Sequence, residues 1–471
     1  MRKKLILTLS LLLIAWAKSY SQPDFDWMKD VGAHSYPAKT KVYNATDYGA
    51  DGDAVMLCTN AIQRAIDECS RNGGGIVTFS PGIYLTGSVF IKSNVNFNIP
   101  KGTTLLGSQN IDDYERINTR VAGIEMKWPA ALINIVGQQN VAISGEGIIH
   151  GKGKVFWDKY RDMRKEYEPK GLRWIVDYDC ERPRGVLISD SKDITVKDIV
   201  LYQPGFWSLH ILYSEQITVD NIIISNNIEG RGPSTDGIDI DSSRKILIEN
   251  CNVNCNDDNF CLKAGRDADG LRVNRPTEYV VIRNCIAGHG DGLFTCGSET
   301  SGSIRNIVAY NLKGIGTKYG LRFKSTVQRG GTVENIYLCN IDMQGVKNPF
   351  VVDLNWLPSY NANRLPKEYD YDTVPVHWKK LLTPVAEQHG TPYFRNIYFE
   401  NINAGDAETC IKAIGMETSL LTHFCFTNVN FEGEKAGTIR FAEKWQTKGL
   451  SVKAKDRELK TENVKDIQAF K

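Results

Sequence analysis

The fold is decided by a short unit that recurs as Ile217-Thr218-Val219-Asp220-Asn221, Ile246-Leu247-Ile248-Glu249-Asn250 and Val280-Val281-Ile282-Arg283-Asn284. Further copies occupy residues 194–198, 307–311, 336–340, 397–401 and 424–428. Apolar residues alternate with other residues in each copy, which predicts a β-strand with one buried face. The closing Asn, or Asp198 in the first copy, suits the left-handed backbone bend that turns one strand into the next.

The closing positions of successive units are 23, 29, 34, 27, 29, 61 and 27 residues apart. Repeats of this length predict a solenoid of parallel strands, because a single coil can bury its apolar face only against its neighbours. A sandwich of antiparallel hairpins is the alternative, and the scarcity of two-residue hairpin turns between the strands disfavours it. We therefore predict one all-β domain, a parallel β-helix, over residues 22–471.

One amphipathic helix precedes the first strands, which we expect at residues 76–79 and 88–91. Its apolar residues fall at helical spacing: Ala61, Ile62, Ala65, Ile66 and Cys69. Gly73-Gly74-Gly75 ends the helix. A helix in this place is expected to cap the N-terminal end of the solenoid.

Two segments, at about residues 152–178 and 354–393, interrupt the repeats. Long insertions in a solenoid usually project from one face as loops, and such loops often carry function. Both are rich in aromatic residues, which either stack on sugars or pack the loops down. Whether the loops leave a cleft open at both ends or wall one end is left open by the sequence.

The N-terminus predicts export. Arg2, Lys3 and Lys4 precede an apolar run and small residues, which together indicate a signal peptide over residues 1–21. We therefore expect a periplasmic or extracellular protein that leaves the membrane once this peptide is removed, and we expect a monomer. The net charge of +2 gives no electrostatic case for nucleic acid.

Eleven cysteines would ordinarily suggest disulfides in an exported protein. The number is odd, however, and Cys251 and Cys285 each follow the closing Asn of a repeat. This favours buried thiols that act as small apolar residues. No spacing resembles a zinc site, so no metal is predicted.

Four short polar segments lie between the strands: Ser234-Thr235-Asp236-Gly237, Asn256-Asp257-Asp258-Asn259, Gly288-His289-Gly290 and Arg322-Phe323-Lys324. Their separations, about 21, 32 and 33 residues, match the coil length, so they should lie side by side on one face. Crowded carboxylates push their pKa values apart, and one can then act as an acid while another acts as a base. Each residue alone could be a turn cap or a solvated surface group, but their joint occurrence favours acid–base work on an anionic substrate.

These segments resemble the four motifs of glycoside hydrolase family 28, the polygalacturonases and their relatives: Asn-Thr-Asp, Asp-Asp, Gly-His-Gly and Arg-x-Lys. The flanking stretches 236–239, 261–267 and 297–299 match as well, and the likeness runs from about Tyr48 to near the C-terminus. The resemblance implies a right-handed parallel β-helix that hydrolyses α-linked galacturonic acid chains with inversion. It implies no cofactor and no metal.

The resemblance also implies roles for the matching residues. Asp257 would be the general acid, and Asp236 and Asp258 would hold and activate the water. His289 would orient or tune the acid. The expected substrate-binding residues are Arg322, Lys324, Ser234 and Lys263, with the two residues of the Arg-x-Lys motif holding a uronate carboxylate.

Ser234 is the one departure from the motifs, because the family usually has Asn there. A hydroxyl is shorter than an amide and has a different donor set, which leaves the linkage that is cleaved in doubt. Endo or exo polygalacturonase action is the first expectation, and a rhamnogalacturonan-specific galacturonohydrolase is the alternative. A pectate lyase and a non-catalytic polysaccharide-binding solenoid are disfavoured, since all three aspartates are present.

Overall fold

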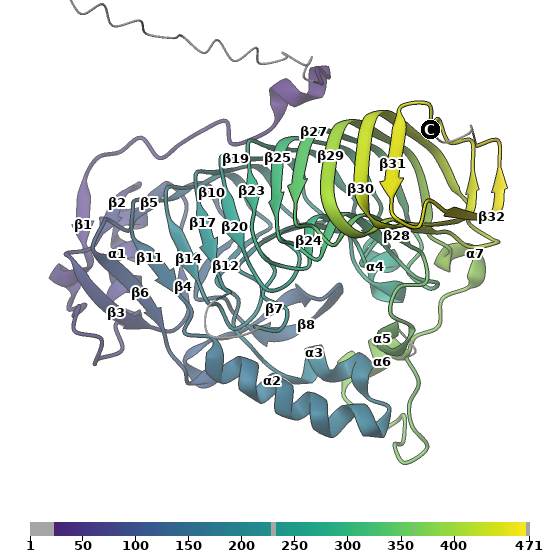
Figure 1. Cartoon of the computed structure of the whole chain (residues 1–471). Helices are drawn as coiled ribbons and strands as arrows, with labels where there is room; N and C mark the ends of the chain where they lie inside the picture. The colour runs from purple at the N-terminus through teal and green to yellow at the C-terminus, as the bar shows by residue number, and fades with distance from the viewer. Residues whose placement is uncertain (1–22, 228–231, 362, 468–471) are drawn as a thin grey trace, which may run out of the picture.

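The computed structural model describes residues 23–227, 232–361 and 363–467, so the predicted signal peptide lies outside the described part. Parallel strands stack in three series around a common core (Figure 1). The first series is β1 (Val42–Asn44), β2 (Gly75–Thr78), β5 (Val95–Asn98), β10 (Gln139–Ser144), β13 (Lys192–Lys197), β16 (Glu215–Asp220), β19 (Arg244–Glu249) and β22 (Thr277–Arg283). The second is β3 (Gly82–Thr86), β6 (Thr103–Gly107), β11 (Ile148–His150), β14 (Val200–Tyr202), β17 (Ile223–Ser225), β20 (Asn252–Asn254) and β23 (Ile286–Ala287).

The third series forms the floor of the candidate site. It consists of β4 (Val89–Phe90), β9 (Ile133–Val136), β12 (Val186–Ser189), β15 (Leu209–Leu212), β18 (Ile238–Asp241), β21 (Phe260–Lys263), β24 (Gly292–Cys296), β26 (Tyr319–Lys324) and β28 (Asn348–Asp353). Toward the C-terminus the series merge into long curved strands and two final strands, β25 (Ile304–Ile315), β27 (Thr332–Gln344), β29 (Tyr393–Ile414), β30 (Leu421–Glu443), β31 (Leu450–Ala454) and β32 (Leu459–Lys465). The predicted right-handed parallel β-helix is confirmed.

The recurring unit sets the register of the stack. Its first apolar residue pairs with the same residue of the next coil, so one column runs through Ile217, Ile246, Val280, Ile307, Ile336, Ile397 and Phe424. All seven side chains are completely buried. Burying a side chain of this size stabilises the fold by roughly 1.5–3 kcal/mol, so a slip in register would be costly.

The closing Asn adopts the predicted left-handed conformation, with φ between 52° and 56° at Asn221, Asn250, Asn284, Asn311, Asn340, Asn401 and Asn428. The side chains also bond to one another from coil to coil. Asn340 donates to Asn311 at 3.3 Å and accepts from Asn401 at 3.2 Å. Asn therefore recurs at the end of each unit for two reasons: it tolerates the left-handed bend, and its side chain continues a ladder of amide hydrogen bonds.

Helix α1 (Thr59–Arg71) covers the N-terminal end of the stack, as predicted (Figure 1). It buries the five apolar residues identified by their spacing. All eleven cysteines are free and ten of them are buried, which agrees with the expectation of apolar thiols. No helix in the described ranges has the length and apolar character needed to cross a membrane.

A strap at the N-terminus crosses the outer surface of the coils. It contains a 3₁₀ turn over Asp26–Asp30, and Phe25 and Trp27 pack against Tyr337 and Tyr279 at ring distances of 4.5 and 5.5 Å. Lys245 pairs with Asp30 at 2.7 Å. The strap therefore joins several coils from outside.

The two predicted insertions and one hairpin lie together beside the floor (Figure 1). The antiparallel hairpin is β7 (Arg116–Val121) and β8 (Ile124–Pro129). The first insertion holds α2 (Lys154–Tyr167) and α3 (Val176–Asp179), and the second holds α5 (Pro358–Asn361), α6 (Val376–Leu382) and α7 (Glu387–Gly390). The remaining elements are α4 (Asp267–Val273) and 3₁₀ turns at Ala45–Tyr48, Ile111–Asp113, Glu168–Lys170 and Arg173–Ile175.

Most aromatic residues of the insertions are buried and hold the loops together by packing against other side chains. Trp174 meets Trp378 edge to face at 5.5 Å, which joins the first insertion to the second. Trp157 and Tyr160 are also buried. A ring that could stack on a sugar is therefore rare in these loops, and Trp356 is the clearest case because it lines the pocket described below.

Replacing Asn340 by Ala should destabilise the protein by about 2–5 kcal/mol. The left-handed backbone costs alanine about 1–2 kcal/mol, whereas asparagine tolerates it because its short polar side chain can hydrogen-bond locally. Two ladder hydrogen bonds worth about 0.5–1.5 kcal/mol each are also lost. Asn340→Gly should cost less, since glycine tolerates this backbone. Thermal unfolding of the two variants and of Gln344→Ala, an exposed change on β27, tests this. Equal losses for Ala and Gly would contradict the backbone contribution.

Candidate active site

The coil spacing brings the predicted carboxylates together. Asp236 leads into β18 and Asp257 and Asp258 lead into β21, the next floor strand. Carboxylate oxygens of Asp236 and Asp258 lie within 4.8 Å of each other, as expected for neighbouring coils. The turns thus deliver three acids to one place.

These residues border one pocket of about 210 Å³. Six of the eight predicted site residues line it: Ser234, Asp236, Asp257, Lys263, Arg322 and Lys324. Asp258 does not line the pocket, but it is completely buried and bonded to Arg322 and Lys324, which do line it. His289 is exposed and lines a neighbouring hollow of about 320 Å³, which shares Asp291 with the pocket.

Asp258 is held as a carboxylate. Lys324 and Arg322 donate to its two oxygens at 2.8 and 3.0 Å, and Thr295 donates to one of them at 2.8 Å. Burial opposes ionisation, but the two cations outweigh it and keep the pKa of Asp258 far below its usual range. This group is therefore ionised in the folded protein.

Asp257 has the opposite character. Burial in the site, followed by the charges of Asp236 and Asp258, raises its pKa well above the usual range. Its oxygen accepts the backbone N–H of Asp258 at 3.0 Å. Two adjacent residues on one turn thus differ in protonation because their side chains face different neighbours, as an acid and base pair requires.

Lys263 belongs to a buried charge cluster. Its ammonium lies 3.4 Å from Asp236, 3.5 Å from Asp239 and 3.6 Å from Glu299, and it stands 4.8 Å from the centre of the Trp207 ring. Burial and Glu299 raise the pKa of Asp239 to about 8 despite this lysine. Burial and then Asp239 likewise raise the pKa of Asp236. Lys263 therefore neutralises the carboxylates around it as well as lining the pocket.

The expected substrate-binding cations are less free than the sequence suggests. Besides contacting Asp258, Arg322 lies 3.5 Å from Asp291 and over the Tyr319 ring, and Lys324 lies over the Trp356 ring at 4.6 Å. Asp236, Asp258 and Cys261 have the spacing of metal ligands. Lys324 and Arg322, however, already place two positive charges against the oxygens of Asp258, and their repulsion of a further cation argues against a calcium-dependent lyase site.

Sequence reasoning missed the pocket wall. Asp177 in the first insertion accepts hydrogen bonds from Ser234 at 3.1 Å, Arg182 at 3.1 Å, Arg173 at 3.0 Å and Tyr160 at 3.2 Å. The departure at Ser234 is therefore matched by a partner from the insertion. No repeat or motif marks Asp177, whereas Asp291 and Glu299 adjoin quoted motifs and could have been found.

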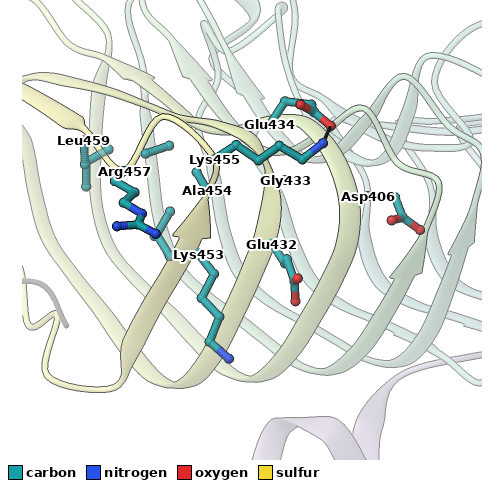
Figure 2. Close-up of a pocket in the computed structure, with 11 residues that line it drawn as sticks. Asp406, Glu432, Gly433, Glu434, Lys453, Ala454, Lys455, Arg457 and Leu459 are labelled. Carbon is teal, nitrogen blue, oxygen red and sulfur yellow. Dashed lines mark hydrogen bonds and ion pairs between the residues drawn. The ribbon is translucent and has the colours of Figure 1, made fainter.

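A larger hollow of about 860 Å³ lies at the C-terminal end (Figure 2). It is lined by Asp406, Glu432 and Glu434 on one part and by Lys453, Lys455 and Arg457 on another. Lys455 and Glu434 form an ion pair at 2.6 Å. These exposed charges pair with each other or face solvent, so size alone does not make this hollow a catalytic site.

The fold and the clustered acids are those of a parallel β-helix with a candidate acid–base site, and comparisons with known proteins identify the family. The model of Glycosyl hydrolases family 28 matches residues 91–377, more than half of the chain, so the chain belongs to this family and is a glycoside hydrolase. A probable polygalacturonase of Vitis vinifera is 28% identical over 81% of this chain and 72% of its own length. An exo-poly-alpha-D-galacturonosidase of Dickeya chrysanthemi is 26% identical over 71% of this chain and 61% of its own length.

Solved structures agree with the fold. A hyperthermoactive exopolygalacturonase from Thermotoga maritima superposes with a TM-score of 0.73 at 25% identity, covering 94% of both chains. A family 28 exopolygalacturonase of Yersinia enterocolitica gives a TM-score of 0.75 at 20% identity over 92% of this chain and 79% of its own.

Replacing Lys324 by Met should shift the acid limb of the pH profile. Loss of this cation beside a buried carboxylate should raise the pKa of Asp258, because burial then opposes ionisation with Arg322 as the main remaining counter-charge. Hydrolysis needs this group ionised, so kcat/KM should begin to fall at a higher pH than in the wild type. Profiles of kcat/KM against pH test this.

Lys412→Met is the control, because Lys412 is exposed and pairs with Asp353 outside the pocket. It should leave the profile unchanged. A raised KM with an unmoved acid limb in Lys324→Met would assign this lysine to substrate binding instead.

Proposed function

We propose that this protein hydrolyses α-linked galacturonic acid chains of pectin. The observation that carries the proposal is the gathering of Asp236, Asp257, Arg322 and Lys324 in one pocket, with both cations bonded to the buried carboxylate of Asp258. The printed names of the relatives, polygalacturonases and an exo-poly-alpha-D-galacturonosidase, support the substrate class.

In the proposed mechanism Asp257 protonates the leaving glycosidic oxygen. Asp258 removes the proton of one water, which Asp236 helps to hold, as that water attacks the anomeric carbon from the opposite face, and this attack inverts the configuration. The close approach of these two carboxylates suits groups that share a single water. Lys263 offsets the charge that gathers on Asp236, and His289 adjusts the acid from the neighbouring hollow.

A second substrate has one observation in its favour. Arg322 and Lys324 are both committed to Asp258, which leaves fewer donors for a uronate on the leaving side. A rhamnogalacturonan, which presents an uncharged rhamnose there, is therefore the alternative. We further propose that the protein is exported by its signal peptide and works as a monomer.

Asp257→Asn should reduce kcat about 10²–10⁴-fold, the usual contribution of a general acid, with KM changed only a few fold. Asp291→Asn makes the same isosteric change in the same pocket, at a residue with no proposed proton transfer. Its loss should be below about tenfold. Steady-state kinetics on polygalacturonate compare the two variants, and similar losses would remove Asp257 from the acid role.

Polygalacturonate and rhamnogalacturonan should be compared side by side. We expect galacturonate release from polygalacturonate, with the new reducing end appearing first as the β-anomer in proton NMR. Methyl esterification should lower the rate, because it removes the charge that the pocket cations meet. Exclusive cleavage of rhamnogalacturonan would establish the alternative, and an unsaturated product would establish a lyase.

A further inference from the structure

We propose that Arg173, on the first insertion, binds the carboxylate of the sugar in the pocket and makes the pocket select a uronate. This inference rests on the proposed function and names the group that recognises its substrate. Four cations line the pocket, and they divide into two sets. Lys263, Arg322 and Lys324 belong to the floor strands β21 and β26, whereas Arg173 belongs to the wall that the insertions build.

The three floor cations are matched by carboxylates. Two of these cations bond to Asp258, and Lys263 lies within 3.6 Å of three acids. The pKa values of Asp236, Asp239 and Asp257 are raised, which lets these three groups be neutral. Three carboxylates still remain beside the three cations, and they are Asp258, Glu299 and Asp291. Among the described residues, the floor therefore has no surplus of positive charge for a further anion.

The wall, in contrast, has more cations than carboxylates. Asp177 pairs with two cations at once, Arg173 at 3.0 Å and the completely buried Arg182 at 3.1 Å. Glu168 lies 3.6 Å from Arg173, but Arg164 pairs with it more closely. Three arginines thus share two carboxylates, which leaves one positive charge that a substrate carboxylate can balance.

Arg173 is also the most accessible of the cations that line the pocket. Its side chain is 17% exposed, against 5% for Lys263, 6% for Arg322 and 7% for Lys324. A guanidinium carries five N–H donors in a planar fork that fits a carboxylate. Arg173 spends one donor on its hydrogen bond to Asp177 and can offer others to a ligand in the pocket.

The fold holds Arg173 in place before a substrate arrives. This residue begins the 3₁₀ turn over Arg173–Ile175, in which the next two side chains are buried. One of them, Trp174, packs against Trp378 of the second insertion. The guanidinium itself lies over the Tyr360 ring at 5.0 Å. A cation already fixed by its neighbours has less conformational freedom to lose when it binds a ligand.

The cations of the pocket therefore have separate tasks, and kinetics can distinguish them. Lys324→Met should move the acid limb of the pH profile, because Lys324 holds Asp258. Arg173→Gln should instead lower kcat/KM on polygalacturonate at least about fivefold through a raised KM, because a charge-assisted hydrogen bond to the substrate is lost. Its acid limb should stay where it is in the wild type. An acid limb displaced as far in Arg173→Gln as in Lys324→Met would overturn this division of tasks.

Binding measured without hydrolysis tests the inference directly. The probes are galacturonate and galactose, which share a ring and differ at the carboxylate, and ligand-observed NMR titrations give their affinities. We expect the wild type to prefer galacturonate. Arg173→Gln should weaken galacturonate binding at least about fivefold and change galactose binding less than about twofold.

The glutamine variant should fold like the wild type, because glutamine keeps a donor toward Asp177 and Arg182 still neutralises that carboxylate. Thermal unfolding checks this. Arg173→Lys keeps the charge but not the planar fork, so it should show a smaller loss of the same kind. This lysine variant decides the question if the glutamine variant does not fold, and unchanged galacturonate binding in it would then overturn the inference.

Arg305→Gln is the matched control, because Arg305 pairs with Glu278 at 2.8 Å outside the pocket. It should leave both affinities unchanged. If Arg173→Gln keeps the preference for galacturonate, the inference is overturned while the proposed function stands. If the wild type has no such preference, the inference is also overturned, and hydrolysis of polygalacturonate then decides whether the proposed function falls with it.

Discussion

Each coil of this solenoid can bury its apolar inner face only against the coils on either side, and the rest of the structure depends on this constraint. The column that begins at Ile217 and Ile246 holds every coil in one register. A residue at a fixed phase of the repeat is thereby given a fixed place along the stack. Asp236, Asp257 and Arg322 are far apart in the sequence yet meet in one pocket, because each leads into or lies on a floor strand.

The same packing makes the site electrostatically demanding. Three carboxylates cannot share a buried place without cations, and Arg322, Lys324 and Lys263 supply them from neighbouring coils. Removal of one partner leaves an uncompensated buried charge, which is costly. The cations that allow the cluster to exist are therefore also the groups that decide which aspartate is ionised, so stability and catalysis are linked in this site.

The sequence predicted those parts of the structure that follow from a periodic pattern of residues. The repeat predicted the coils, the closing Asn predicted the left-handed bend, and the helical spacing from Ala61 to Cys69 predicted the cap. The motifs predicted which residues would approach the pocket, and the structure places His289 in the adjoining hollow. The wall could not be predicted, because Asp177 and Tyr360 lie in irregular insertions whose contacts depend on packing between distant segments.

The N-terminal strap has a consequence for the order of assembly. Phe25 and Trp27 are synthesised early, yet the tyrosines they contact, Tyr337 and Tyr279, are made much later. The strap has no complete docking surface until those coils have stacked. We therefore expect the strap to dock late in folding, after the coils that it contacts have formed.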